Sequence, residues 1–273
     1  MGDVKDGPSG VGAASGTISG YPREDENSLM WLWRSVGQGV TPSSVVGTSN
    51  VSAPARMAEW MNANGNAFGT SVYISFHSNA GGGRGADGLI SNSGASYKPT
   101  PNQAALALYT GRQINQDLQA LNGVFEHNWS AKTTHTLTGA FGEINDDDFI
   151  NSSGVVEMDA TIIEVAYHDN VQDAQLMRDP KVRDQIARST YEATLEYFDN
   201  YGGLATPVAV ASAPTGLSVT SETSGEVTLQ WAAGPTGVQG GLATGYRIYA
   251  STDGYGFDGG TYVAGGATVG LSG

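Results

Sequence analysis

The chain of 273 residues contains no cysteine, few basic residues and no long apolar run. Without cysteine there are no disulfides and no thiolate ligands, so any zinc ion must be held by histidine and carboxylate groups. Only 13 lysines and arginines oppose 27 acidic residues, and the net charge of -14 disfavours nucleic acid and anionic membranes as partners by simple repulsion. No segment reaches the roughly 18 to 20 apolar residues of a membrane-spanning helix. We therefore predict no membrane span.

The two ends of the chain are rich in glycine and lack recognisable elements. Residues 1–20 do not show the charged and then apolar pattern of a signal peptide. If the protein is exported, we expect the export signal to lie outside these 273 residues. Residues 259–273 stop without a closing element. Both ends are therefore predicted to be cut.

Helical and strand patterns alternate over the first two thirds of the chain. Apolar residues recur at helical spacing after the acidic turn at residues 24–26, and again in residues 54–64, 103–121 and 181–201. Residues 71–79 and 159–168 are short apolar runs of the kind found in buried strands. This alternation predicts an α/β fold with a mainly parallel sheet flanked by helices.

The pattern changes at Gly202. Residues 204–212 form a linker rich in proline, alanine and valine, and period-two alternation follows it. The segments 217–219, 227–231 and 246–249 are predicted to be antiparallel strands of an all-β sandwich. We therefore expect a first domain at residues 1–203, a linker at 204–212 and a partial all-β domain at 213–273.

A histidine and a glutamate stand at the ends of the two predicted buried strands. His77 follows an apolar run just before a glycine-rich loop, and Glu164 is a lone carboxylate within an apolar strand. Ligands of open α/β sheets bind at the carboxyl ends of strands. An unpaired buried charge costs several kcal/mol or more, so Glu164 needs a compensating group. The pair suggests a hydrolytic metal site. The alternatives are a hydrogen-bonded core histidine and a structural ion pair.

The residues around both strands resemble a known enzyme family. Residues 76–80, Phe-His-Ser-Asn-Ala, and residues 161–165, Thr-Ile-Ile-Glu-Val, followed by His-Asp-Asn at 168–170, are similar to motifs of the zinc-dependent N-acetylmuramoyl-L-alanine amidases. The resemblance covers roughly residues 10–200. It implies an exported bacterial peptidoglycan hydrolase, periplasmic or at the cell surface, that cleaves the amide between N-acetylmuramic acid and L-alanine through a zinc-bound water.

The resemblance also assigns roles to particular residues. The family holds zinc with two histidines and a glutamate, and a second glutamate acts on the bound water. His77 matches the later histidine, Glu164 the catalytic glutamate, and Glu26 the glutamate ligand, with Glu24 as the alternative. No histidine precedes His77, so the first metal histidine and its strand are expected to be missing from this chain.

The remaining polar motifs have simpler interpretations. His127, His135 and His168 are expected to be structural or surface residues, with His127 or His135 as a substitute for the missing metal histidine as the alternative. Glu143 is expected to be a surface carboxylate, and the alternative is a place lining the cleft. Residues 146–148, Asp-Asp-Asp, lack the alternate spacing of a calcium loop and are predicted to form a solvated turn. Residues 83–88 match the dinucleotide pattern G-x-G-x-x-G. No helix is predicted to open there, so the match is attributed to chance.

The C-terminal residues resemble the start of a fibronectin type III domain. Residues 213–217, the core residue Trp231 and residues 245–249 are similar to the marks of its first three strands. A complete domain of this sandwich class has about seven strands and about 100 residues. The 61 residues from 213 to 273 are therefore expected to form only part of one.

Two other functions remain open from the sequence. A wall-binding protein without catalysis would keep the groove and lack a complete metal site. A related zinc peptidase would act on peptides that carry no sugar.

Overall fold

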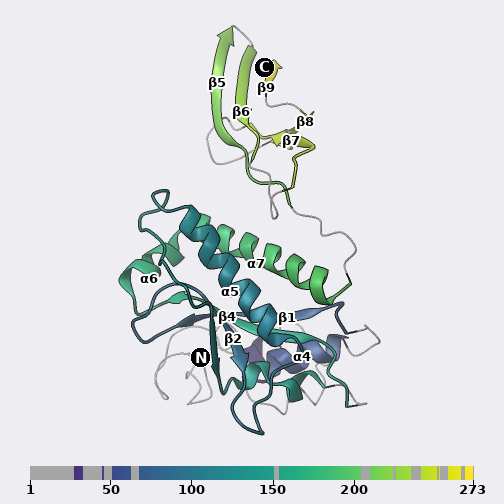
Figure 1. Cartoon of the computed structure of the whole chain (residues 1–273). Helices are drawn as coiled ribbons and strands as arrows, with labels where there is room; N and C mark the ends of the chain where they lie inside the picture. Colours follow the sequence, from purple (N-terminus) through teal and green to yellow (C-terminus); the bar gives the residue numbers. More distant parts are fainter. Residues whose placement is uncertain are drawn as a thin grey trace. The chain divides into compact units, whose positions relative to one another are not determined.

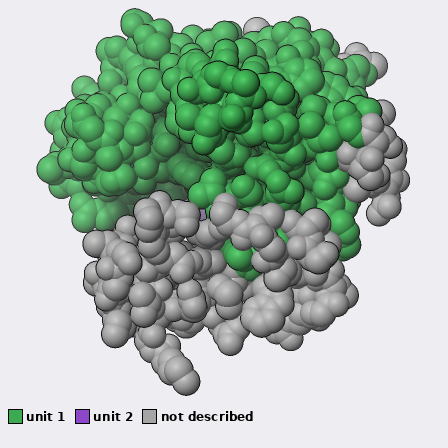
Figure 2. All heavy atoms as spheres, turned by 90° about the horizontal axis from the view of Figure 1, so that it is seen from below, with its two compact units in different colours: residues 1–205 green, residues 206–273 purple. Residues whose placement is uncertain are grey.

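The computed structural model describes residues 28–32, 45, 51–62, 68–150, 154–203, 210–223, 226–234, 241–250, 252, 258–265 and 268–272. The chain divides into two compact units, residues 1–205 and 206–273. Figure 2 shows the described surface of the first unit in green.

The first unit is built on a four-stranded sheet in the order β1-β4-β2-β3. These strands are β1 (Val72–Asn79), β4 (Asp159–Tyr167), β2 (Asp87–Ser91) and β3 (Thr136–Gly139). The pairs β1–β4 and β2–β3 are parallel, whereas β4 and β2 are antiparallel. The sheet is therefore mixed, although two of its three pairings have the predicted parallel direction. The short loop at residues 80–86 reverses the chain, because a parallel connection needs a crossover of about a dozen residues or more.

Helices cover both faces of this sheet. On one face, α5 (Gln103–Ala120) and α7 (Pro180–Tyr201) lie side by side, with α6 (Val171–Arg178) at their end (Figure 1). On the other face lie α4 (Ala53–Asn62) and the 3-10 turns η2 (Gly142–Ile144) and η3 (Asp146–Phe149). Successive side chains of β4 point to opposite faces of the sheet, so Ile163 packs with α5 and Ile162 packs with α4.

The strongly periodic segments fold as predicted. The helices expected at 54–64, 103–121 and 181–201 are α4, α5 and α7, and the strands expected at 71–79 and 159–168 are β1 and β4. Of the helix expected after residue 26, the structure describes α2 (Ser28–Trp31), beside α4. No helix among the described residues is long and apolar enough to cross a membrane.

Two glycines allow α5 to lie directly against β2. A Cβ atom at Gly88 would lie 2.0 Å from the carbonyl oxygen of Ala107, and one at Gly111 would lie 2.2 Å from the carbonyl oxygen of His135. Cβ atoms essentially never approach other atoms to within 3.0 Å. The contact between helix and strand therefore requires glycine at both positions.

We expect Gly88→Ala to destabilise the first unit by about 1–3 kcal/mol, because the added methyl group must push α5 away from the sheet. Gly142→Ala is the control, since its Cβ would meet its nearest neighbours at an ordinary 3.9 Å. Urea unfolding of the two variants measures the difference. Equal midpoints for Gly88→Ala and the wild type would contradict the close packing.

The second unit contains only strands among its described elements. A three-stranded antiparallel sheet has the order β5-β6-β9, formed by β5 (Thr215–Thr223), β6 (Glu226–Ala232) and β9 (Thr268–Ser272). A separate antiparallel pair joins β7 (Gly245–Ile248) and β8 (Thr261–Ala264). The buried ring of Trp231 meets Tyr246 edge-on, with ring centroids 5.1 Å apart. Trp231 therefore packs as a core residue.

Candidate active site

The two residues singled out in the sequence lie opposite each other in the sheet. His77 of β1 is the register partner of Glu164 of β4, and on the other side of β4 Glu164 pairs with Asp87 of β2. Register partners project from the same face of a sheet. Directly after His77 the pairing of β1 with β4 shifts register, and such irregularities are common beside active sites. A row of one imidazole and two carboxylates therefore crosses three strands.

His77 is partly exposed and contacts a third carboxylate. Its Nε2 atom lies 3.0 Å from Oε2 of Glu143 and 3.1 Å from Oγ of Ser75. The side chain of His77 is 37% exposed, whereas that of Glu143 is 9% exposed. The hydrogen bond with Glu143 raises the pKa of His77 above its ordinary value, although burial opposes this rise.

Glu143 is not the surface carboxylate that the sequence suggested. It lies in η2, is buried, and accepts a 2.6 Å hydrogen bond from the hydroxyl of Tyr73. Burial raises the pKa of Glu143, but its hydrogen bonds with His77, Ser75 and Tyr73 together hold it below the ordinary value. The prediction was wrong because η2 packs against β2, β4 and α4, and an irregular segment gives no periodic sign of such packing.

Glu164 is the least compensated carboxylate of the group. Its Oε2 atom is buried and has no hydrogen-bond partner among the described residues. Burial raises the pKa of Glu164, the charge of His77 lowers it in part, and Asp87 raises it further. A raised pKa makes a carboxylate a stronger proton acceptor than an ordinary one, as a general base requires.

Asp87 lies on the far side of Glu164 and is fully buried. One of its oxygens accepts hydrogen bonds from the ammonium of Lys132 and the hydroxyl of Tyr167, and its Oδ1 atom has no partner among the described residues. The lysine offsets the charge of Asp87. The negative charge of Asp87 still raises the pKa of Glu164 and thereby favours the protonated form of Glu164.

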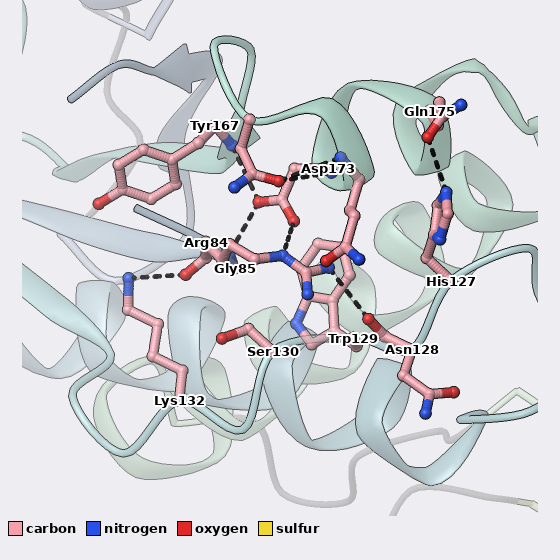
Figure 3. Close-up of polar contacts among 12 residues, drawn as sticks. Arg84, Gly85, His127, Asn128, Trp129, Ser130, Lys132, Tyr167, Asp173 and Gln175 are labelled. Carbon is pink, nitrogen blue, oxygen red and sulfur yellow. Dashed lines mark hydrogen bonds and ion pairs between the residues drawn. The ribbon is translucent and has the colours of Figure 1, made fainter. Parts of the chain in front are cut away.

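A buried carboxylate, together with the exposed Asp169, holds the loop that follows His77. Asp173 of α6 accepts hydrogen bonds from the side chain of Arg84 at 2.8 Å and from the backbone N–H groups of Gly85 and Tyr167 at 2.9 and 3.2 Å (Figure 3). Asp173 thus ties the loop between β1 and β2 to the end of β4. These hydrogen bonds hold the loop after His77 in place beside the end of β4, the strand that carries Glu164.

We expect Asp173→Asn to destabilise the first unit by about 3–5 kcal/mol, because it leaves the guanidinium of Arg84 without its charged partner and two backbone donors with a weaker acceptor. Asp184→Asn makes the same chemical change at an exposed position of α7 and is expected to leave stability unchanged. Thermal unfolding followed by circular dichroism measures both. A Tm for Asp173→Asn equal to that of the control would exclude this role.

Each of the other three histidines hydrogen-bonds to a neutral side chain. His127 pairs with Gln175 at 2.7 Å, His135 with Asn115 at 3.0 Å and His168 with Ser78 at 3.0 Å. These contacts are consistent with structural roles. Glu24 and Glu26 lie outside the described residues.

Two further sequence predictions can be compared with the structure. The predicted solvated turn at residues 146–148 is the 3-10 turn η3, in which Asp148 is buried and pairs with Arg56 at 3.0 Å. The turn is confirmed and Asp147 is exposed, but Asp148 is not solvated because η3 packs against α4. After the glycine pattern at 83–88 the chain continues as β2, and no helix opens there. A dinucleotide site at this position is therefore excluded.

The side chains at the site are of the right chemical types for zinc. The Nδ1 atom of His77 has no hydrogen-bond partner in the described part of the chain, and Oε2 of Glu164 is buried without one. Imidazole and carboxylate are both zinc ligands. No group of three or more potential ligands is brought together within the described residues.

Comparison with known proteins identifies similarity over the first unit. The profile of the N-acetylmuramoyl-L-alanine amidase family matches residues 48–196. Among solved structures, the CwlD amidase from Clostridioides difficile, determined in complex with the GerS lipoprotein, is similar with a TM-score of 0.39 and 14% identity. That match covers 55% of this chain and 64% of the CwlD chain, so it spans less than two thirds of the solved protein. No curated protein matches.

Proposed function

Because this chain belongs to the N-acetylmuramoyl-L-alanine amidase family, we propose that it hydrolyses the amide bond between the lactyl group of N-acetylmuramic acid and L-alanine in peptidoglycan. The observation that carries the proposal is the register pairing of His77 with Glu164 on adjacent strands inside the matched region. An imidazole and a carboxylate with a raised pKa side by side are what metal-assisted hydrolysis requires.

Glu164 is assigned the proton transfer. Its carboxylate would accept a proton from the attacking water as the water oxygen bonds to the carbonyl carbon. When the carbon–nitrogen bond breaks, the same carboxyl group would return that proton to the amine of L-alanine. The unpartnered Oε2 atom leaves a lone pair free for this transfer.

His77 is assigned to the metal, with Glu26 as the second proposed ligand and Glu24 as its alternative. A bound zinc ion lowers the pKa of water to about 7 and polarises the amide carbonyl. The described residues supply the imidazole of His77 for this purpose. Glu26 lies outside them, and its role rests on the sequence resemblance alone.

The substrate also gives a place of action. Peptidoglycan lies outside the cytoplasmic membrane, so we propose that the protein is exported and acts in the periplasm or at the cell surface. The net charge of -14 disfavours nucleic acid as a competing partner.

For the second unit we propose a spacer role. The antiparallel strands and the buried Trp231 support the interpretation of residues 213–273 as part of a fibronectin type III-like domain. Residues 204–212 would form the linker that precedes it.

Release of free amine from two matched substrates tests the proposal. The zinc-loaded chain is incubated with a muropeptide and with the same stem peptide without sugar. Amines that are newly formed in each digest are labelled, and the residue that carries each new amine is identified, since the L-alanine amine of the sugar-free peptide is free from the start. The proposal predicts release from the muropeptide alone. Release from both substrates would indicate a peptidase, and binding to peptidoglycan without any release would indicate a wall-binding protein.

A further inference from the structure

A chain of hydrogen bonds connects Tyr73 of β1 to the proposed ligand His77, on the same strand, through Glu143. Tyr73 donates its hydroxyl proton to Oε1 of Glu143 at 2.6 Å, and Oε2 of the same carboxylate lies 3.0 Å from Nε2 of His77. Tyr73, Ser75 and His77 alternate along β1 and therefore share one face of the sheet. Glu143 reaches this face from η2, a segment 70 residues away in the chain.

One oxygen of the Glu143 carboxylate faces Tyr73 and the other faces His77. The contact with His77 decides which ring nitrogen of His77 carries the proton. An ionised carboxylate only accepts hydrogen bonds, so the atom of His77 that faces it must carry a proton. That atom is Nε2. The lone pair of the neutral ring then lies on Nδ1, which has no hydrogen-bond partner in the described part of the chain.

We propose that Glu143 is a positioning residue of the metal site, which holds the proton of His77 on Nε2 so that Nδ1 is the atom that binds the metal. This inference rests on the proposed function. Histidine ligands of metals generally donate their second ring N–H to a carboxylate, a carbonyl or water, which fixes the tautomer and the orientation of the ring. Glu143 supplies that carboxylate, and Tyr73 holds Glu143 in place.

The burial of Glu143 supports this role. Its side chain is 9% exposed. Burial of a carboxylate costs folding free energy unless hydrogen bonds satisfy its oxygens. Tyr73 and His77 together provide these bonds. A carboxylate that served only the packing of η2 would not need to face an imidazole.

The tautomer can be read directly, because the chain has only four histidines. Long-range proton–nitrogen correlation spectra separate protonated, unprotonated and metal-bound ring nitrogens, and His77→Ala identifies the signals of His77. For the wild type we expect a protonated Nε2 before zinc is added, and a metal-bound Nδ1 afterwards. In Glu143→Gln the metal-free protein is expected to show a mixture of both tautomers, because an amide can present either a donor or an acceptor to the ring.

Zinc affinity gives a second reading that does not depend on activity. Loss of such a partner typically weakens metal binding about 10- to 100-fold, and we expect a loss of this size for Glu143→Gln. Tyr73→Phe, which keeps the ring and removes only the donor, is expected to cause a smaller loss in the same direction. Glu192→Gln is the matched control, since Glu192 is also buried but pairs with Arg188 on α7.

The outcomes separate this inference from the proposed function. Zinc bound through Nε2 with a proton on Nδ1 would overturn the inference, because Glu143 would then face a metal-bound atom. Unchanged zinc affinity in Glu143→Gln would overturn it as well, and both results would leave the amidase proposal standing. A wild-type chain that binds no zinc would overturn the metal site and the role of Glu143 with it.

Discussion

Replacing Glu164 with glutamine is expected to lower the rate of amide hydrolysis by about 10²- to 10⁴-fold, the usual contribution of a positioned general base. Glutamine keeps the size of the side chain but cannot accept the proton of the attacking water. Zinc binding should be retained, because Glu164 is not assigned as a ligand. Rates of amine release from a muropeptide, measured with zinc content verified, test this expectation.

Glu192→Gln provides the matched comparison, since it removes a buried carboxylate of α7 that pairs with Arg188. Its rate should equal that of the wild type. If Glu164→Gln hydrolysed the substrate within a few-fold of the wild-type rate, the assignment of Glu164 would be wrong. A loss of zinc in this variant would instead indicate that Glu164 is a ligand.

We also expect Glu164→Gln to affect the folding stability of the metal-free protein. The pKa of Glu164 in the folded chain is raised, chiefly by burial. Ionisation therefore costs folding free energy, and this cost appears as the pH rises from the ordinary value through the raised one. Below the ordinary pKa the carboxyl is neutral in both states and no cost arises. At neutral pH the metal-free Glu164→Gln protein should consequently be at least as stable as the wild type.

The second large effect is expected at His77. We expect His77→Ala to lose the zinc that the wild-type chain retains after metal loading and desalting, at about one ion per chain. Removing the imidazole leaves only one of the two proposed protein ligands, Glu26, whereas a catalytic zinc usually has three. Elemental analysis of the desalted proteins gives the stoichiometry. Amide hydrolysis should be lost together with the metal.

His127→Ala is the control for this experiment, because His127 hydrogen-bonds to Gln175 and is not register-paired with Glu164. It should retain the wild-type amount of zinc. Equal zinc in His77→Ala and the wild type would remove His77 from the metal site. Loss of zinc in both variants would indicate that His127 also contributes to the metal site.

The parts of the fold that could be predicted from the sequence are those with strong local periodicity. The segments that became α5, α7, β1 and β4 bury one continuous face or both faces, so their apolar residues recur at regular spacing. The direction of β2 could not be predicted in this way. It follows from the short loop at residues 80–86 and from the ties of that loop to Asp173, which are tertiary contacts.

The candidate site shows the same division. His77 and Glu164 could be predicted because a polar residue in an apolar strand stands out against its neighbours. Glu143 could not, since it lies in a short 3-10 turn whose burial results from packing over Tyr73 and Ile162. The alternation of Tyr73, Ser75 and His77 on one face of β1 was the available signal that this face carries polar contacts. Glu26 lies outside the described residues, and its assignment stays a prediction.

Hydrolysis in water enriched in heavy oxygen tests the central claim most directly. A muropeptide is digested by the zinc-loaded chain, and the masses of both products are determined. Our account predicts that the label enters the lactyl carboxylate of N-acetylmuramic acid, that the stem peptide leaves with a free and unlabelled amine at L-alanine, and that Glu164→Gln suppresses both. Label found only within the stem peptide, or products formed equally well by Glu164→Gln, would contradict it.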